Sequence, residues 1–165
     1  MPQAAQDHGH VEVELRSHPQ GRVAWVRMAN PGRLNAGSPA LVAALTARFQ
    51  DLAGDDELRC AVLTGDGDKA FMAGAADNSF VMGMPEVRVG LPSVVEAALL
   101  PGLIGWGRTR EVLLTGANYD AEQALAMGMV ERLVPAEALD ATVEEWVGQI
   151  LACGPTAVRS QKVLM

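Results

Sequence analysis

A loop of small residues and a glutamate that follows a proline are the parts of this sequence best suited to chemistry. The loop is Ala73-Gly74-Ala75-Ala76, and the glutamate is Glu86. Because alanine and glycine have no large side chain, backbone N–H groups in such a loop can approach a ligand closely. Amides placed in this way can stabilise a developing oxyanion, and a carboxylate can transfer a proton. The stretch from Phe71 to Pro92 therefore combines an oxyanion-stabilising loop with an acid.

The composition is that of a soluble globular protein of one domain. The chain has 165 residues, of which 49% are hydrophobic and 20% charged, and this balance argues against disorder. The net charge of −7, without a basic run, argues against a nucleic-acid partner. No apolar run approaches the ~20 residues that span a bilayer, and Met1 to His10 is polar rather than a secretory signal. We therefore expect no membrane partner and a cytoplasmic location.

The histidines and cysteines exclude several other kinds of site. His8, His10 and His18 all precede the body of the chain, so a Ser-His-Asp hydrolase or a histidine-ligated metal site lacks its imidazole. Cys60 and Cys153 form no Cys-x-x-Cys pattern, and buried thiols of this kind pack as small hydrophobic groups. The sequence therefore predicts no metal.

The first half of the chain predicts strands and a helix before the small-residue loop. Two alternating segments, Val11–Leu15 and Val23–Met28, are typical of a hairpin. Ser38 followed by proline starts a helix that Gly54 ends, and the strand Cys60–Thr64 reads as covered on both faces. The apolar residues of one predicted helix face recur three and four positions apart: Leu41, Leu45, Phe49 and Leu52.

The glycine-rich segment that follows this strand, Gly65 to Lys69, predicts a tight turn. It lacks the Gly-Lys-Ser/Thr of a P-loop and the spaced acids of a calcium loop. Lys69 remains a candidate for holding a phosphate.

The second half predicts helices separated by one strand. A helix after Pro92 should present one apolar face and end at Pro101-Gly102. Asp120 and Gln123 suit the start of a helix that Gly128 ends, and Met129–Val134 reads as a strand. Two further helices follow. The predicted apolar face after Pro92 is made of Val94, Val95, Ala98 and Leu99, the helix after Pro135 carries Leu139, Val143, Trp146, Val147 and Ile150, and Thr156 to Met165 is amphipathic.

The order and spacing of several motifs resemble those of the enoyl-CoA hydratase/isomerase (crotonase) superfamily over roughly Val11 to Met165. The resemblance implies an α/β fold, a crotonase-like right-handed ββα superhelix with a helical C-terminal portion. It implies a flexible tail at residues 1–10, a core at 11–135 and helices at 136–165. The matching motifs are Arg33-Leu34-Asn35-Ala36, Val62–Gly65, Ala70–Ala75, Gly83–Val87, Gly90–Pro92, and Leu113–Gly116 with Ala121–Val130 and Val134-Pro135.

The resemblance also implies roles for individual residues. The chain would be a lyase that adds water to, or isomerises, trans-2-enoyl-CoA thioesters of fatty acid metabolism, with acyl-coenzyme A as substrate and no cofactor. Glu86 matches one catalytic glutamate, and the N–H of Ala75 matches one oxyanion donor. Two roles stay open for Glu96, which either lines the pocket or lies on a solvated helix face. The residues matched to coenzyme A binding are Arg33, near the nucleotide phosphates, with Asn35, Ala36, Lys69, Ala73 and Gly74.

One departure from the family concerns its middle. Members carry a helix, a buried strand, a glycine-rich turn and a further helix between the small-residue loop and the Pro-Glu motif, and this chain lacks them, with the junction at about Ala75/Ala76. The missing turn would hold the second oxyanion donor, and the first catalytic glutamate would follow it. The usual C-terminal helices are also missing. Family members assemble as homotrimers or hexamers, which we expect here.

Two alternatives remain open at this point. The chain is either an enzyme of the family that possesses, or once possessed, the missing internal segment, or a catalytically silent module that truly lacks this segment and keeps a coenzyme A surface for binding or assembly. An unrelated α/β domain is the third reading, and the order of the motifs argues against it.

Overall fold

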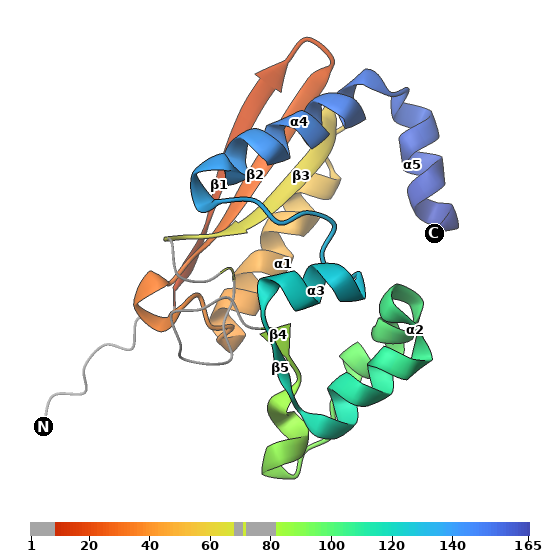
Figure 1. The fold of residues 1–165 in the computed structure, drawn as a ribbon. Coiled ribbons are helices and arrows are strands. Elements are labelled where there is room, and N and C mark those ends of the chain that lie inside the picture. Colours follow the sequence, from red (N-terminus) through yellow and green to blue (C-terminus); the bar gives the residue numbers. More distant parts are fainter. Residues whose placement is uncertain (1–8, 68–70, 72–81) are drawn as a thin grey trace, which may run out of the picture. The chain divides into compact units, whose positions relative to one another are not determined.

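The computed structural model describes residues 9–67, 71 and 82–165 (Figure 1). The chain divides into two compact units, and the first is discontinuous in sequence. Unit 1 contains Met1–Ala76 and Ala136–Met165, and unit 2 contains Asp77–Pro135. The predicted junction at Ala75/Ala76 lies outside the described residues.

Unit 1 is a three-stranded sheet with helices. Its strands are β1 (His10–His18), β2 (Gly21–Ala29) and β3 (Leu58–Gly65), and its helices are the 3-10 helices η1 (Pro31–Arg33) and η3 (Ala136–Ala138) with α1 (Pro39–Ala53), α4 (Leu139–Ala152) and α5 (Pro155–Leu164). β1 and β2 form the predicted antiparallel hairpin, in which His18 pairs with Gly21. β3 adds to β2 in parallel, with Val62 beside Trp25.

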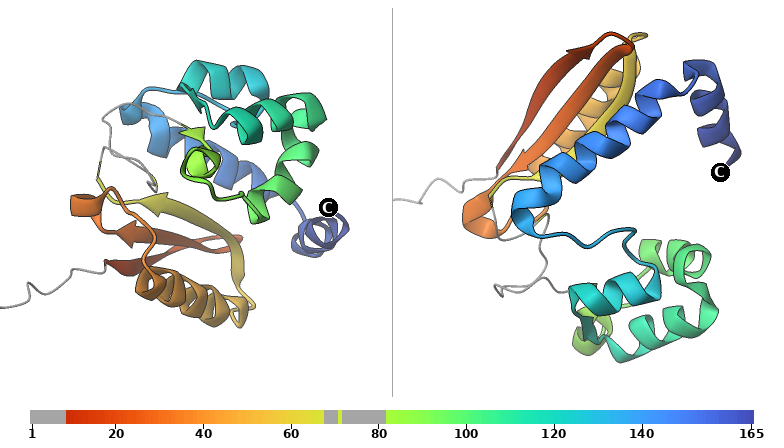
Figure 2. Two further views of the ribbon diagram at one scale, coloured as in Figure 1. Left: turned by 90° about the horizontal axis from the view of Figure 1, so that it is seen from below. Right: turned by 45° about the horizontal axis from the view of Figure 1, so that its top comes forward.

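The sheet of unit 1 is covered by one helix on each face, as the right-hand view of Figure 2 shows. On one face α1 contributes Leu52 to a cluster with Ala24 and Val26. On the other face α4 contributes Val147 and Leu151, which pack against Val23 and Trp25. Each fully buried aliphatic side chain of this kind contributes about 1.5–3 kcal/mol relative to the exposed side chain. Successive side chains of β2 therefore point to opposite faces of the sheet and contribute to the hydrophobic cluster on each face.

Three features of unit 1 differ from the sequence-based expectations. Phe49 of α1 is 37% exposed, so the buried face of this helix is narrower than its spacing predicts. β3 is an edge of the described sheet, and its Leu63 is also 37% exposed. The prediction that β3 is covered on both faces is therefore wrong, because α1 packs chiefly on β1 and β2. On α4, Trp146 is 40% exposed while Leu151 is buried, so the apolar face is displaced from the predicted one.

Unit 2 is mainly helical. Its elements are β4 (Met82–Gly83), η2 (Pro85–Val89), α2 (Val95–Thr115), β5 (Asn118–Tyr119) and α3 (Ala121–Met127). β4 pairs with β5 in an antiparallel bridge that the sequence did not predict. The core of unit 2 contains Leu100, Ile104, Val112 and Tyr119, with Met84 and Met129 packed against them.

The helix after Pro92 runs further than predicted. α2 continues through Pro101 and Gly102 and is interrupted at Gly105, whose φ is 74°. Proline inside a helix lacks one N–H donor and crowds the preceding turn, but its φ is close to the helical value, whereas a positive φ is incompatible with helical geometry. The buried face is carried by Leu100 and Ile104, while Val94 and Leu99 are exposed. The end predicted at Pro101-Gly102 and the predicted apolar face are therefore wrong.

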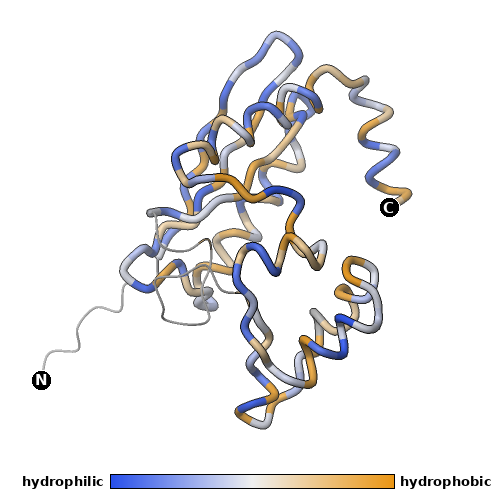
Figure 3. Tube along the Cα trace, in the orientation of Figure 1, coloured by the Kyte–Doolittle hydropathy of each residue, from blue (hydrophilic) through white to orange (hydrophobic). Residues whose placement is uncertain are grey.

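The segment Met129–Val134 is not a strand, which corrects another prediction. Figure 3 shows it as hydrophobic at both ends and hydrophilic in the middle. Met129 packs in the core of unit 2, and its N–H donates to the carbonyl of Ala124 at 2.9 Å. The residue therefore completes the end of α3 instead of joining a sheet. Among the described helices, none is long and apolar enough to cross a membrane.

Candidate active site

Glu86 lies in the first turn of the 3-10 helix η2, in unit 2. Pro85 occupies the first position of this helix, where the missing N–H of proline costs no hydrogen bond. Gly90 ends it with φ of 80°, a left-handed conformation that glycine adopts without strain. The N–H of Leu91 then donates to the carbonyl oxygen of Glu86 at 3.0 Å. The backbone around Glu86 is thus fixed from both sides.

The carboxylate of Glu86 has one partner among the described residues. Ser93 Oγ donates to Glu86 Oε2 at 2.9 Å, and both side chains are half-buried. Sequence reasoning missed Ser93. The signal available was its place directly after the Gly90-Leu91-Pro92 turn, which reverses the chain toward Glu86.

Two glycines allow other backbone segments to approach this helix. A Cβ added to Gly83 would lie 2.6 Å from Asn118 Oδ1 and 2.7 Å from the carbonyl oxygen of Ala117. A Cβ added to Gly116 would lie 3.1 Å from side-chain atoms of Val87 and Arg88. The motif that contains Glu86 and the Thr115-Gly116 motif therefore pack against each other, although they lie far apart in sequence.

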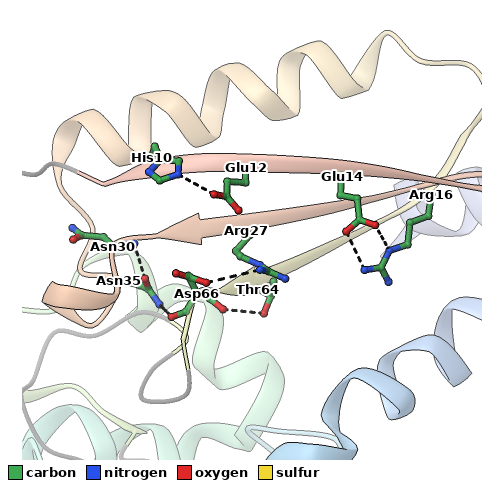
Figure 4. Close-up of polar contacts among 10 residues, drawn as sticks. His10, Glu12, Glu14, Arg16, Arg27, Asn30, Asn35, Thr64 and Asp66 are labelled. Carbon is green, nitrogen blue, oxygen red and sulfur yellow. Dashed lines mark hydrogen bonds and ion pairs between the residues drawn. The ribbon is translucent and has the colours of Figure 1, made fainter.

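The loop Arg33-Leu34-Asn35-Ala36 lies in unit 1, between β2 and α1. Asn35 is fully buried, and its Oδ1 accepts the N–H of Asn30 at 2.9 Å. Its Nδ2 donates to the carbonyl oxygen of Asp66 at 2.8 Å, as Figure 4 shows. Since both ends of the amide bind backbone, Asn35 shapes the loop at the carboxyl ends of β2 and β3. No feature of the sequence pointed to Asp66 as the partner.

Arg33 and Ala36 occupy the same loop with different exposure. Arg33 is exposed at the end of η1, and its guanidinium has no ion pair among the described residues. Ala36 is half-buried, and its N–H donates to the carbonyl of Arg33 at 3.0 Å. The structure thus brings together Arg33, Asn35 and Ala36 on a fixed loop and leaves the arginine accessible to an anion.

Other predicted site residues lie outside the described part of the chain: Lys69, Ala73, Gly74 and Ala75. Glu96 lies in the first turn of α2, and its side chain is not among those described. In the part of the chain that the structure describes, no cluster of three or more His, Cys, Asp or Glu side chains could hold a metal ion.

A charged network on the α4 face of the sheet has a structural role. Arg16 bonds Glu14 at 2.9 Å and reaches Glu144 of α4 at 2.6 Å, so it joins β1 to α4. Its guanidinium carbon also lies 4.1 Å from the centre of the Trp25 ring. The hydrogen bond from Arg16 lowers the pKa of Glu14, and the bond with Glu14 raises the pKa of Arg16. Figure 4 shows the Glu14–Arg16 pair on β1, apart from Asn35.

Comparison with known proteins identifies a family. The model for "Enoyl-CoA hydratase/isomerase" matches residues 18–78 and 75–165. The short-chain-enoyl-CoA hydratase of Clostridium acetobutylicum is 24% identical over 201 residues, which cover 87% of this chain and 77% of that protein. The crotonyl-CoA hydratase of Syntrophomonas wolfei is 36% identical over 89 residues, which cover 53% of this chain and 34% of that protein.

The solved structures agree on the fold. An enoyl-CoA hydratase from Bacillus anthracis superposes with a TM-score of 0.81 at 22% identity, over 91% of this chain and 80% of that one. The enoyl-CoA hydratase subunit from Geobacillus kaustophilus superposes with a TM-score of 0.77 at 25% identity, over 93% of this chain and 80% of that one. These likenesses confirm the predicted α/β crotonase-like class with a helical C-terminal portion.

The family match is divided in two near the predicted junction. Its two parts share only residues 75–78, a range that contains Ala75/Ala76. The alignment with the Clostridium protein, 201 residues long, exceeds the 165 residues of this chain. That relative therefore contains residues that have no counterpart here.

Proposed function

Because this chain belongs to the enoyl-CoA hydratase/isomerase family, we propose that it adds water to, or isomerises, trans-2-enoyl-CoA thioesters. The observation that carries the proposal is the half-buried carboxylate of Glu86, fixed within the motif Gly83-Met84-Pro85-Glu86 that the family match includes. The names of the relatives, a short-chain-enoyl-CoA hydratase and a crotonyl-CoA hydratase, support a short acyl group.

In the proposed mechanism Glu86 orients water or transfers the proton at the carbon chain of the substrate. General acid–base assistance of this kind is typically worth ~10²–10⁴-fold in rate. The N–H of Ala75 donates to the thioester oxygen as negative charge develops there, and one such donor is worth about 3 kcal/mol. The segment without counterpart here is where the family resemblance puts the second donor and the other glutamate.

Coenzyme A binding is assigned to two parts of unit 1. Arg33 is exposed on a loop that Asn35 holds, and an accessible guanidinium suits the nucleotide phosphates. Ala36, Lys69, Ala73 and Gly74 complete the proposed surface. Asn35 acts through the loop, because its side-chain amide is occupied by backbone groups of Asn30 and Asp66.

The assembly and location are proposed from the resemblance and from the sequence. We propose a homotrimer or hexamer in the cytoplasm. Exposed apolar side chains on α2, such as Leu103 and Trp106, each 64% exposed, support the burial of this helix in an assembly. Light scattering that shows a stable monomer at micromolar concentration would contradict the assembly.

The test of the function is the loss of enoyl thioester absorbance on crotonyl-CoA. Glu86→Gln keeps the shape of the side chain and removes its ionisable oxygen, so we expect kcat to fall by about 10²–10⁴-fold with coenzyme A binding unchanged. Glu96→Gln is the matched control and should have a milder effect. Wild-type activity in Glu86→Gln would remove this residue from the mechanism.

Two further measurements separate the alternatives. An intact mass near 17.4 kDa would show that the protein lacks the internal segment that its relatives carry. Calorimetry with coenzyme A then distinguishes an inactive binding module, which releases heat, from a chain that has lost the coenzyme A surface.

A further inference from the structure

We propose that Ser93 is a positioning residue for Glu86, and this rests on the proposed function. Its hydroxyl donates to Oε2 of Glu86 at 2.9 Å. Oε1 has no hydrogen-bond partner within the described residues. One oxygen of the carboxylate is thus held by the protein, and the other is left for water or substrate.

The contact is built by a short local segment. Gly90 takes φ of 80° and ends the 3-10 helix, and Leu91 N–H donates to the carbonyl oxygen of Glu86 at 3.0 Å. Pro92 then restricts the backbone directly before Ser93. Glu86 and Ser93 are seven residues apart and belong to the same unit, so the contact lies within one short stretch of the chain.

The chemical value of the contact is orientation. A glutamate has three side-chain torsions, and a free carboxylate samples positions from which neither oxygen reaches the substrate. A catalytic group must be held within about 0.5 Å of its productive place, and a 1 Å error can cost ~10²-fold in rate. Ser93 keeps its own proton throughout, because the proton that the reaction moves is exchanged at Oε1.

The experiment compares Ser93→Ala with the conservative Ser93→Thr. We expect Ser93→Ala to lower kcat on crotonyl-CoA about 10–100-fold with KM unchanged, and Ser93→Thr, which keeps a hydroxyl, to restore most of it. Ser160→Ala, which removes an exposed hydroxyl of α5, controls for the substitution and should match wild type. Both variants should stay folded at the assay temperature by circular dichroism, so that a fall in kcat reports the lost contact and not unfolding.

A double-mutant cycle separates this proposal from the proposed function. If Ser93 acts through Glu86, Ser93→Ala has no further effect in Glu86→Gln. If Glu86→Gln is slow and Ser93→Ala is as fast as wild type, the positioning role is overturned and the proposed function stands. If Glu86→Gln is as fast as wild type, the catalytic role of Glu86 is overturned, and the positioning role with it.

A readout that needs no activity completes the test. In protein labelled with 13C-glutamate, the side-chain carboxyl signal of Glu86 is identified by its loss in Glu86→Gln. Ser93→Ala should shift that signal, and Ser93→Thr should return it toward the wild-type position. An unchanged signal in Ser93→Ala would overturn the proposal even if the wild-type protein were inactive on crotonyl-CoA.

Discussion

The side-chain amide of Asn35 donates to the carbonyl oxygen of Asp66 at 2.8 Å, and this contact joins the loop after β2 to the end of β3. Asn35→Ala removes it together with the bond from Asn30 N–H, and leaves both backbone groups without these partners. We expect the free energy of unfolding to fall by about 1–3 kcal/mol. Urea denaturation measures it. Arg33→Ala, on the exposed side of the same loop, should leave stability unchanged; an equal loss in both would contradict the role of Asn35.

Gly83 should tolerate no side chain. Gly83→Ala would put a Cβ 2.7 Å from the carbonyl oxygen of Ala117, so the β4–β5 bridge must open. We expect a lower thermal midpoint by circular dichroism. Gly102→Ala on α2 is the matched control, since an added Cβ there would lie more than 4 Å from every described atom outside its own stretch of helix. A helix interior favours alanine over glycine by roughly 0.5–1 kcal/mol, so the control should gain stability. Equal thermal midpoints for Gly83→Ala and wild type would show that the β4–β5 bridge accommodates the added methyl group without loss of stability.

Acid should weaken the contact network of β1. The folded-state pKa of Glu14 is lowered, chiefly by its hydrogen bond with Arg16, so its contribution to stability is present above the unfolded value of 4.5. That contribution is lost as the pH falls through the folded pKa. We therefore expect the thermal midpoint of wild type to fall more steeply below pH 4.5 than that of Glu14→Gln. Parallel curves for the two proteins would exclude this pair as a source of acid sensitivity.

The two cysteines should differ in reactivity. Burial raises the pKa of the half-buried Cys60 thiol, whereas Cys153 is exposed. Since the thiolate is the reactive form, iodoacetamide should modify Cys153 first. Peptide mass spectrometry at pH 8 follows both sites, and Cys153→Ser isolates the slow reaction. Faster labelling of Cys60 would mean that the α4 face of the sheet opens readily.

Local capping signals in the sequence predicted the start of α1 and both ends of α3. Ser38 Oγ accepts the N–H of Leu41 at the start of α1, as the Ser-Pro pair indicates. Asp120 and Gln123 exchange both bonds of a capping box, and Gly128 ends α3. Such caps depend on residues within a few positions of each other, so a single sequence contains the whole interaction.

Signals that depend on distant partners were less informative. Met129–Val134 has the apolar residues of a strand, but a strand also needs a neighbour, and Met129 instead packs in the helical core of unit 2. Leu63 is exposed because α1 packs chiefly on β1 and β2. The residue pattern of β3 alone does not indicate how much of the sheet α1 covers. In the candidate site, the Gly-Met-Pro-Glu motif was enough to predict Glu86. The contact of Ser93 with Glu86 depends on the conformation of the turn between them, which the residue types alone do not define.

The bond between Arg16 and Glu144 joins residues 128 positions apart, and this separation affects how the protein is made. On the ribosome β1, β2 and β3 emerge long before α4, which covers Val23 and Trp25. Until then the nascent sheet exposes that apolar face to chaperones and to other unfinished chains. Closing so long a loop costs entropy before any contact is gained, which slows folding.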